Sequence, residues 1–275
     1  MPSKTRWIAC AGIVGVLGIG TAGAMVSAAA GSSSPRVVKH KAAGPVTTAD
    51  ISFSASLSGV TSSPVTITGD GEADFTNDAV SLTVNIPGAV AQLIPGGSDS
   101  PEVVNAVLSG GTIYLEVPSL ASLVGEPWIS VALPTQVTSA LPGGFTKIAS
   151  ALGDVNAIVK FAQKHHATVT SLGTAMVDGV QATGNKMAAT HTKKGTTQTL
   201  SASIWADSSD RLRQGNVSVT GTGAKATHGL TATVDLSGYG TPVTITVPPS
   251  SQVKSIAYST VAAFFGKFLN TSRRG

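Results

Sequence analysis

Strict alternation of apolar and polar side chains begins after Asp50 and constrains the fold more than any other feature of the chain. From Ile51 to Ser58 every odd-numbered residue is apolar and every even-numbered residue is serine. Successive side chains of a β-strand point to opposite faces, so this pattern predicts a strand with one buried face and one wet face. Half-buried strands of this kind are typical of antiparallel sheets. We therefore expect an antiparallel sheet with one apolar face.

Further strands follow the same rule. Residues 65–67 continue the alternation, and Gly69-Asp70-Gly71 predicts a reversal of the chain. Residues 80–86 form another alternating strand, which a Pro-Gly pair ends. Residues 101–108 instead have apolar residues at helical spacing, with Glu102 in the first turn, where a carboxylate complements the helix dipole. This segment predicts a short helix.

The N-terminus predicts export. Lys4 and Arg6 precede an uncharged segment that runs to Ser34, and three alanines, Ala28 to Ala30, offer a peptidase site. Basic residues, an apolar segment and small residues in this order are typical of a Sec-type signal peptide, which we place at residues 1–30. The segment is long enough to span a bilayer, so a retained anchor is the alternative to cleavage.

The only cysteine, Cys10, would leave with the signal peptide, which excludes disulfides and cysteine zinc sites from the exported chain. Two of the 18 basic residues would leave as well, so 16 basic residues face 14 acidic ones, a net charge of +2. This small and scattered excess argues against nucleic-acid binding. Residues 31–47 lack apolar periodicity and predict a flexible linker.

Two segments have strong helical patterns. Residues 145–165 carry an apolar stripe that includes Ile148, Leu152, Val155 and Val159. Residues 250–275 predict a second amphipathic helix, with three phenylalanines on one face and basic residues near its ends. Three roles stay open for the second helix: packing on the sheet, plugging a cavity mouth, or lying on an anionic membrane surface.

Three blocks of sequence stand out by their order and spacing. Residues 227–249 combine an alternating strand, a Tyr-Gly turn and a second strand that ends in Pro-Pro. Residues 111–131 place a strand, a Pro-x-Leu loop and a Pro-Trp strand in succession. Residues 167–213 contain an Asp-Gly-Val turn between strands, then Trp205 and Asp207 before a turn that leads to two arginines. Together the blocks cover most of residues 50–249.

These blocks resemble the LolA-like, LppX/LprAFG-type family of bacterial envelope lipoproteins. The chain departs from that family after Asp-Gly-Val, where it has residues 181–185 in place of a Thr-Thr-His-Tyr strand. A polar loop at residues 193–197 also replaces a helix, which leaves the shape of a cavity mouth and the ligand open. Family members carry a lipidated cysteine after their hydrophobic segment, whereas Cys10 precedes it here.

The resemblance implies an α+β fold in which a strongly curved antiparallel half-barrel has helices over its concave face, formed here by residues 48–249. It also implies an exported envelope protein that binds lipid or lipoglycan acyl chains in an apolar cavity and carries them between the membrane and the outer envelope. Strand parity and helix stripes give the residues expected to line the cavity: Phe53, Ala55, Leu57, Val65, Ile67, Leu82, Val84, Leu115, Ile148, Leu152, Val155 and Val159.

Motifs of catalysis are missing from the sequence: it contains no Gly-x-Ser-x-Gly elbow, no His-Glu-x-x-His and no phosphate loop. Its histidines lack ligand spacing, so we expect no enzyme activity, no metal and no cofactor. The expected partners are a lipid or glycolipid and a membrane surface reached through the C-terminal helix, with no nucleic acid. A non-carrying envelope sensor or scaffold, with its interior filled by its own helices, is the alternative, and an envelope hydrolase is a weaker one.

Overall fold

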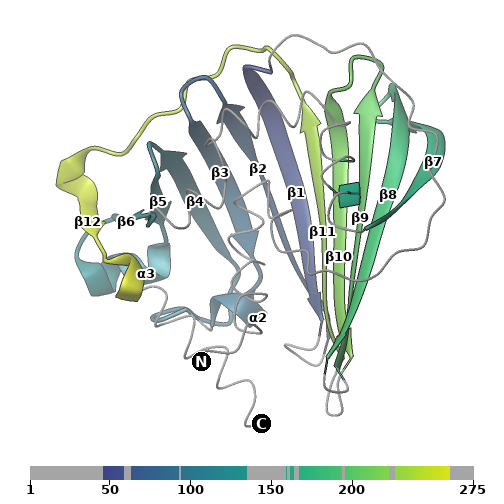
Figure 1. Cartoon of the computed structure of the whole chain (residues 1–275). Helices are drawn as coiled ribbons and strands as arrows, with labels where there is room; N and C mark the ends of the chain where they lie inside the picture. Colours follow the sequence, from purple (N-terminus) through teal and green to yellow (C-terminus); the bar gives the residue numbers. More distant parts are fainter. Residues whose placement is uncertain are drawn as a thin grey trace.

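A single twelve-stranded sheet contains every strand that the structure describes (Figure 1). The structure is a computed structural model that describes residues 46–58, 63–92, 94–134, 159, 162–163, 167–193, 196–222 and 227–260. The strand order is β12-β6-β5-β4-β3-β2-β1-β11-β10-β9-β8-β7. All neighbours are antiparallel except β12 and β6, which run parallel. The strands at the two ends of this order, β12 and β7, are the edges of the sheet.

Long strands and very short helices make up the described chain. The helices are α2 (Gly88–Ala91) and α3 (Pro118–Val124), with a 3-10 turn at Ser250–Gln252. The strands are β1 (Thr48–Ser58), β2 (Val65–Asp74), β3 (Ala79–Ile86), β4 (Glu102–Ser109), β5 (Thr112–Glu116), β6 (Trp128–Ala132), β7 (Thr168–Val177), β8 (Val180–Lys193), β9 (Thr196–Asp207), β10 (Leu212–Thr222), β11 (Thr227–Ser237) and β12 (Val253–Ser255).

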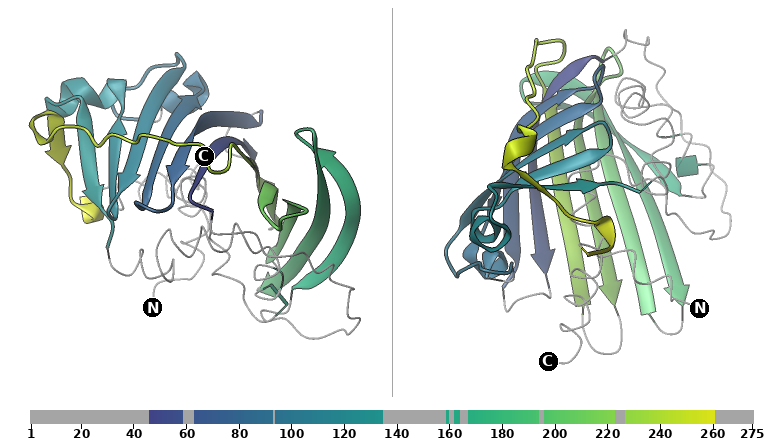
Figure 2. Two further views of the ribbon diagram at one scale, coloured as in Figure 1. Left: turned by 90° about the horizontal axis from the view of Figure 1, so that it is seen from above. Right: turned by 90° about the vertical axis from the view of Figure 1, so that its left-hand side faces the viewer.

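The sheet is strongly curved and open, so that from above it forms an arch (Figure 2). Strand β1 stands near the middle and pairs with β2 on one side and with β11 on the other. The main core lies on the inner face of the arch, where strand residues such as Ile51 and Leu236 pack with Val159 and Ala162. The predicted curved antiparallel sheet is thus confirmed.

Several predictions concern residues outside the described ranges. These are the signal peptide, nearly all of the linker at residues 31–47, most of the helix at residues 145–165, and residues 261–275 of the C-terminal helix. Of the helix at 145–165, the described residues Val159, Ala162 and Gln163 are helical. A helical cover over the concave face therefore stays a prediction.

The reversal predicted at Gly69-Asp70-Gly71 is wrong, because β2 continues through these residues to Asp74. The chain turns at residues 75–78, where an Asp74 carboxylate oxygen accepts hydrogen bonds from the backbone of Thr76 (3.0 Å) and Asn77 (3.1 Å). The two glycines serve packing, since a Cβ atom at Gly69 would lie 2.5 Å from the Phe53 ring. A Cβ at Gly71 would meet the Ser81 carbonyl oxygen at 1.9 Å.

The helix predicted at residues 101–108 is also wrong, because this segment is strand β4. Its valines are β-branched and suit a strand, β3 pairs with it along its whole length, and β5 pairs with Asn105–Ser109. Val104, Ala106 and Leu108 face the inside of the arch, while Asn105 lies on the other face. Pairing with β3 and β5 has overridden a helical spacing of four apolar residues.

The C-terminal region departs from prediction in two places. Residues 241–249, predicted as a second strand of a closing hairpin, form no regular secondary structure. The helix predicted from residue 250 is replaced at its start by a 3-10 turn and by β12, which pairs with β6 through Val253 and Trp128. Helical backbone begins only at Tyr258. The open backbone edge of β6 explains the change, because it supplies hydrogen bonds to a chain that lies along it.

Candidate functional site: the apolar inner face

The inner face of the sheet is apolar along rows that cross the strands. Residues that are direct partners in neighbouring strands share a face, so the pairing register assigns each row. One row runs from Leu236 in β11 to Ile129 in β6. Between them it passes through Ile51 (β1), Gly71 (β2), Leu82 (β3), Ala106 (β4) and Leu115 (β5). The next row runs from Ile204 in β9 to Val104 in β4. Between them it passes through Gly215 (β10), Val234 (β11), Phe53 (β1), Gly69 (β2) and Val84 (β3).

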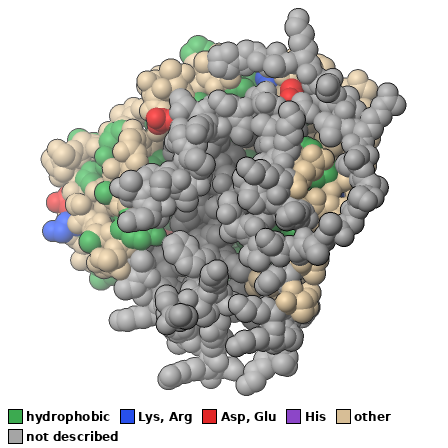
Figure 3. Space-filling model, viewed as in Figure 1, with side chains coloured by type: hydrophobic (Ala, Val, Ile, Leu, Met, Phe, Trp, Pro, Cys, Tyr) green, Lys and Arg blue, Asp and Glu red, His purple; other side chains and the backbone are tan. Residues whose placement is uncertain are grey.

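A third row extends the apolar face toward β8. It passes through Met187, Ala202, Val217, Ala232, Ala55 and Ile67, each of which is a direct partner of the next. No charged side chain interrupts these three rows. On the view of the molecule in Figure 3, the described side chains in sight are mostly hydrophobic or neutral.

Most of the residues predicted to line a cavity lie on this face. Phe53, Leu82 and Val159 belong to the buried core, and Ile67, Val84 and Leu115 pack against it while partly exposed. Ala55 and Val65 are buried, and Leu57 is partly buried at the far end of the face. Ile148, Leu152 and Val155 lie outside the described residues. The structure thus brings nine of the twelve residues onto or against one surface, and their role as a ligand site stays a prediction.

The inner face is closely packed over β2 but less so over part of β10. The space over Gly69 and Gly71 in β2 is taken up by Phe53 and by Leu82 with its neighbours. Over Gly215 in β10, by contrast, an added Cβ atom would meet none of the described residues within 4 Å, although its direct partner Ile204 is buried. Val217, two residues further along β10, is 40% exposed.

We call Ala202, Gly215, Val217 and Ala232 the β9–β11 patch. These residues lie in adjacent rows of the inner face, and three of them have side chains no larger than a methyl group. None of them is among the residues predicted from the sequence to line a cavity. Small residues at inward positions of otherwise apolar strands were the signal that could have pointed to them. The β9–β11 patch is the place on the described inner face with open space above an apolar surface.

A second hollow on the apolar side is small. Val80, Leu82, Ala106 and Leu108, together with Val107 and Ile113, line a cavity of about 10 Å³. That volume holds about one water molecule and no acyl chain. Leu82, which the sequence analysis placed in a cavity, therefore lies at a packed site, and the β9–β11 patch is the better candidate.

The outer face is polar and tied together by side-chain hydrogen bonds. The Gln214 amide donates to the Asp235 carboxylate at 2.7 Å, and Thr233 donates to Asn216 at 2.7 Å. Nearer β5, the Asn105 amide donates to the Glu116 carboxylate at 2.8 Å. The uncharged rows of the inner face therefore suit an apolar ligand better than this hydrogen-bonded outer face does.

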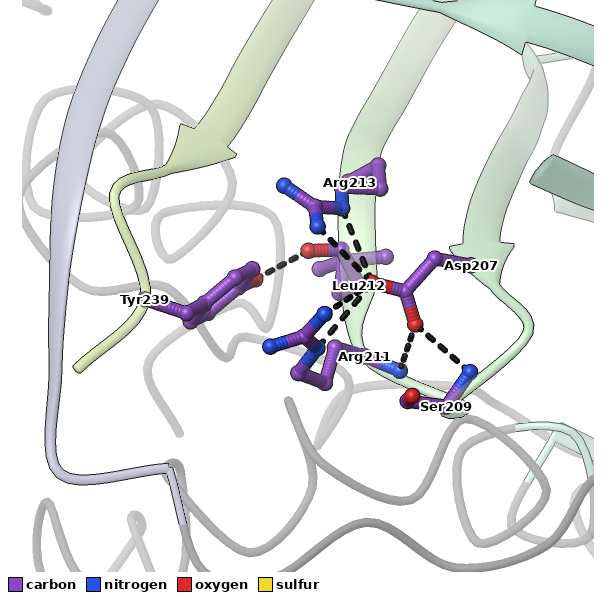
Figure 4. A network of polar contacts seen from close by, with 6 residues as sticks. All are labelled: Asp207, Ser209, Arg211, Leu212, Arg213 and Tyr239. Atoms are coloured by element: carbon purple, nitrogen blue, oxygen red, sulfur yellow. Dashed lines mark hydrogen bonds and ion pairs between the residues drawn. The ribbon is translucent and has the colours of Figure 1, made fainter. Parts of the chain in front are cut away.

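A buried ionic network fixes the ends of β9, β10 and β11 (Figure 4). One carboxylate oxygen of Asp207 accepts hydrogen bonds at 3.0 Å from Nε of both Arg211 and Arg213. The other accepts backbone N–H groups of Ser209 (2.9 Å) and Arg211 (3.1 Å). Burial raises the pKa of Asp207, but hydrogen bonds from Arg211 and Arg213 and the charge of Arg211 outweigh it and hold that pKa below its ordinary value.

Tyr239 completes the network from the turn after β11. Its ring lies 5.3 Å from the Arg211 guanidinium carbon and 5.2 Å from that of Arg213, and its hydroxyl donates to the Leu212 carbonyl. Burial also raises the pKa of the Tyr239 phenol. The network joins two of the sequence blocks described above, 167–213 and 227–249. Because the Asp207 carboxylate and the Tyr239 hydroxyl are both engaged within it, we interpret the network as structural.

Among the described residues, no group of three or more histidine, cysteine or acidic side chains is arranged to hold a metal ion. Within the same ranges, no helix has both the length and the hydropathy needed to cross a bilayer.

In a comparison with known proteins, two solved structures are similar to this chain. The crystal structure of Mycobacterium tuberculosis lipoprotein LppX is 12% identical, with a TM-score of 0.39, and the alignment covers 73% of this chain and 90% of that one. A LolA superfamily protein from Nitrosomonas europaea is 11% identical, with a TM-score of 0.27, over 77% of this chain and 92% of that one. Both belong to the groups that the sequence resembles. No family model and no curated protein matches the chain.

Proposed function

We propose that this chain is an exported envelope protein that binds the acyl chains of a lipid or lipoglycan on the inner face of its sheet. The observation that carries the proposal is the open, uncharged β9–β11 patch next to a packed apolar core. A sheet with one apolar face must cover that face with another layer. Where the cover leaves a gap, an acyl chain gains about 0.8 kcal/mol for each methylene that it buries.

The sequence supports the proposed location in the envelope. Residues 1–30 have the order of a signal peptide, and the exported chain would hold no cysteine. A carrier in the envelope would take up a lipid at one membrane and release it further out. The amphipathic segment within residues 250–275 would bring the open face to an anionic membrane surface.

An envelope sensor or scaffold on the same fold is the second candidate. The hollow of about 10 Å³ at Leu82 and the Phe53 ring over Gly69 favour it, because that half of the inner face is filled by its own side chains. A carrier needs an apolar volume of several hundred Å³. The two candidates therefore differ in whether the β9–β11 patch is occupied by ligand.

Blocking the β9–β11 patch tests the proposal. Val217→Trp adds a large side chain at an exposed inner position, and we expect uptake of a fluorescent fatty acid to fall at least tenfold. Ser218→Trp, the next residue on β10 and on the polar face, is the matched control and should bind the probe as wild type does. Circular dichroism and unfolding in urea would verify that both variants fold. Equal uptake by both would contradict a ligand site at the patch.

A further inference from the structure

The two edges of the sheet are built differently. Strand β12 covers β6 with only three residues, one of them Lys254. Short strands and lysines are the usual protection of a sheet edge against pairing with another chain. The opposite edge, β7, is ten residues long and contains neither a charged residue nor a proline.

Strand β7 is also exposed and partly apolar. Within the described part of the chain its backbone ladder is formed with β8 alone. Met176 is 67% exposed and Leu172 is 40% exposed, which places them among the most exposed large apolar side chains described. A long, neutral edge with apolar side chains is a site for strand pairing.

We propose that β7 pairs antiparallel with β7 of a second copy of this chain, so that the two sheets join edge to edge. A strand without charges can oppose itself with no like-charge repulsion, which favours a second copy over a charged foreign segment. A two-fold axis makes the same surface meet itself, as in most homodimers.

The exposed side chains select the register. If the two-fold axis passes through Thr174, this residue lies opposite itself and Gly173 of each copy lies opposite Ala175 of the other. Leu172, the extra residue of the bulge, then lies beside Met176 of the other copy, so the two exposed apolar residues meet twice across one interface. The bulge between Ser171 and Gly173 lies in the β7–β8 ladder, and the regular segment that follows it, Gly173–Val177, includes the axis. Directly opposed residues of an antiparallel pair have Cα atoms about 4.5–5.5 Å apart.

A single cysteine on the axis tests the pairing. In the full chain with Cys10→Ser, Thr174→Cys should form a disulfide-linked dimer under mild oxidation, because the expected spacing suits a disulfide. Ser54→Cys, equally exposed but on a central strand, is the control and should stay monomeric on a non-reducing gel. Efficient cross-linking at Ser54, or none at Thr174, would overturn the proposed register.

Sedimentation of the otherwise unmodified protein tests the dimer itself. We expect wild type to sediment at about twice the chain mass of 27.4 kDa, less any cleaved signal segment. Met176→Lys places two lysines in the interface and should raise the dissociation constant at least tenfold, whereas Ser54→Lys should leave it unchanged. A wild-type protein that stays monomeric at all concentrations, or a dimer insensitive to Met176→Lys, would refute pairing through β7. This result is independent of lipid binding.

Discussion

Gly71 and Gly215 lie on the same apolar face, but their surroundings differ. At Gly71 an added Cβ would meet backbone atoms of β3, the nearest at 1.9 Å, whereas at Gly215 it would meet no described residue within 4 Å. We therefore expect Gly71→Ala to destabilise the fold by about 1–3 kcal/mol, since the backbone would have to shift. Gly215→Ala should change stability by no more than about 0.5 kcal/mol. Urea unfolding of both variants measures the difference, and equal stabilities would contradict the open space over Gly215.

Asp207 makes folding dependent on pH. Its folded pKa lies below the ordinary value, so its contribution to stability is present above about pH 4 and is lost as pH falls through the lower folded value. Asp207→Asn removes the negative charge that pairs with Arg211 and Arg213. The Arg211 side chain is only 31% exposed, so water screens its charge only in part. We expect a loss of about 2–4 kcal/mol at pH 7.

The pH profile separates this role from a general packing defect. The stability gap between wild type and Asp207→Asn should shrink as pH falls below about 4, because the unfolded wild-type chain takes up a proton on Asp207 there and the folded carboxyl does so at its lower pKa. Asp70→Asn, an exposed carboxylate on the outer face, is the control and should change stability by less than about 0.5 kcal/mol. A gap that stays constant from pH 7 to pH 3 would contradict the ionic role.

At the scale of elements, α3 depends on a side chain from β4. The backbone N–H of Ser119 donates to a Glu102 carboxylate oxygen at 2.6 Å, and the Ser119 hydroxyl donates to the other oxygen at 3.1 Å. This carboxylate takes the place of an N-cap residue, since Val117 at the cap position has no side-chain acceptor.

Glu102→Ala should therefore cost about 1 kcal/mol, the usual value of a helix cap. It should also speed amide hydrogen exchange at Ser119, while amides in the middle of β4 keep their protection. Glu72→Ala, an exposed position on β2, is the control. Unchanged exchange at Ser119 would show that the carboxylate does not hold the helix end.

Elements with strict alternation could be predicted from the sequence, and elements whose form depends on a distant partner could not. β1 follows the predicted alternation, with Phe53 buried between two exposed serines. β4 was taken for a helix because its spacing fits both patterns and only its pairing with β3 and β5 decides between them. β12 shows the same limit, because its strand form depends on β6.

The candidate site was predictable only in part for the same reason. The alternation of side chains between the two faces of a strand placed Phe53 and Val84 on the inner face correctly, because this alternation depends on one strand alone. The open space over Gly215 depends on which side chains neighbouring strands and helices place there. A glycine by itself cannot reveal this, as Gly71 and Gly215 demonstrate.

For the whole molecule, β1 is the strand that holds the two halves of the sheet together. It pairs with β2, its neighbour in sequence, and with β11, which begins about 170 residues later, as in the contact of Ser58 with Gly229 across 171 positions. Joining the two halves of the sheet therefore requires segments from both ends of the domain. The inner apolar face, which spans both halves, is a property of this complete arrangement.

The central claim is that this face holds a lipid, and native mass spectrometry combined with organic extraction tests it most directly. The protein would be purified without detergent from the envelope of an actinobacterial host. We predict a bound species of several hundred daltons or more that is lost on extraction and identifies the ligand class. A clean apo mass, together with no uptake of a fluorescent acyl probe, would contradict lipid binding and favour the sensor or scaffold.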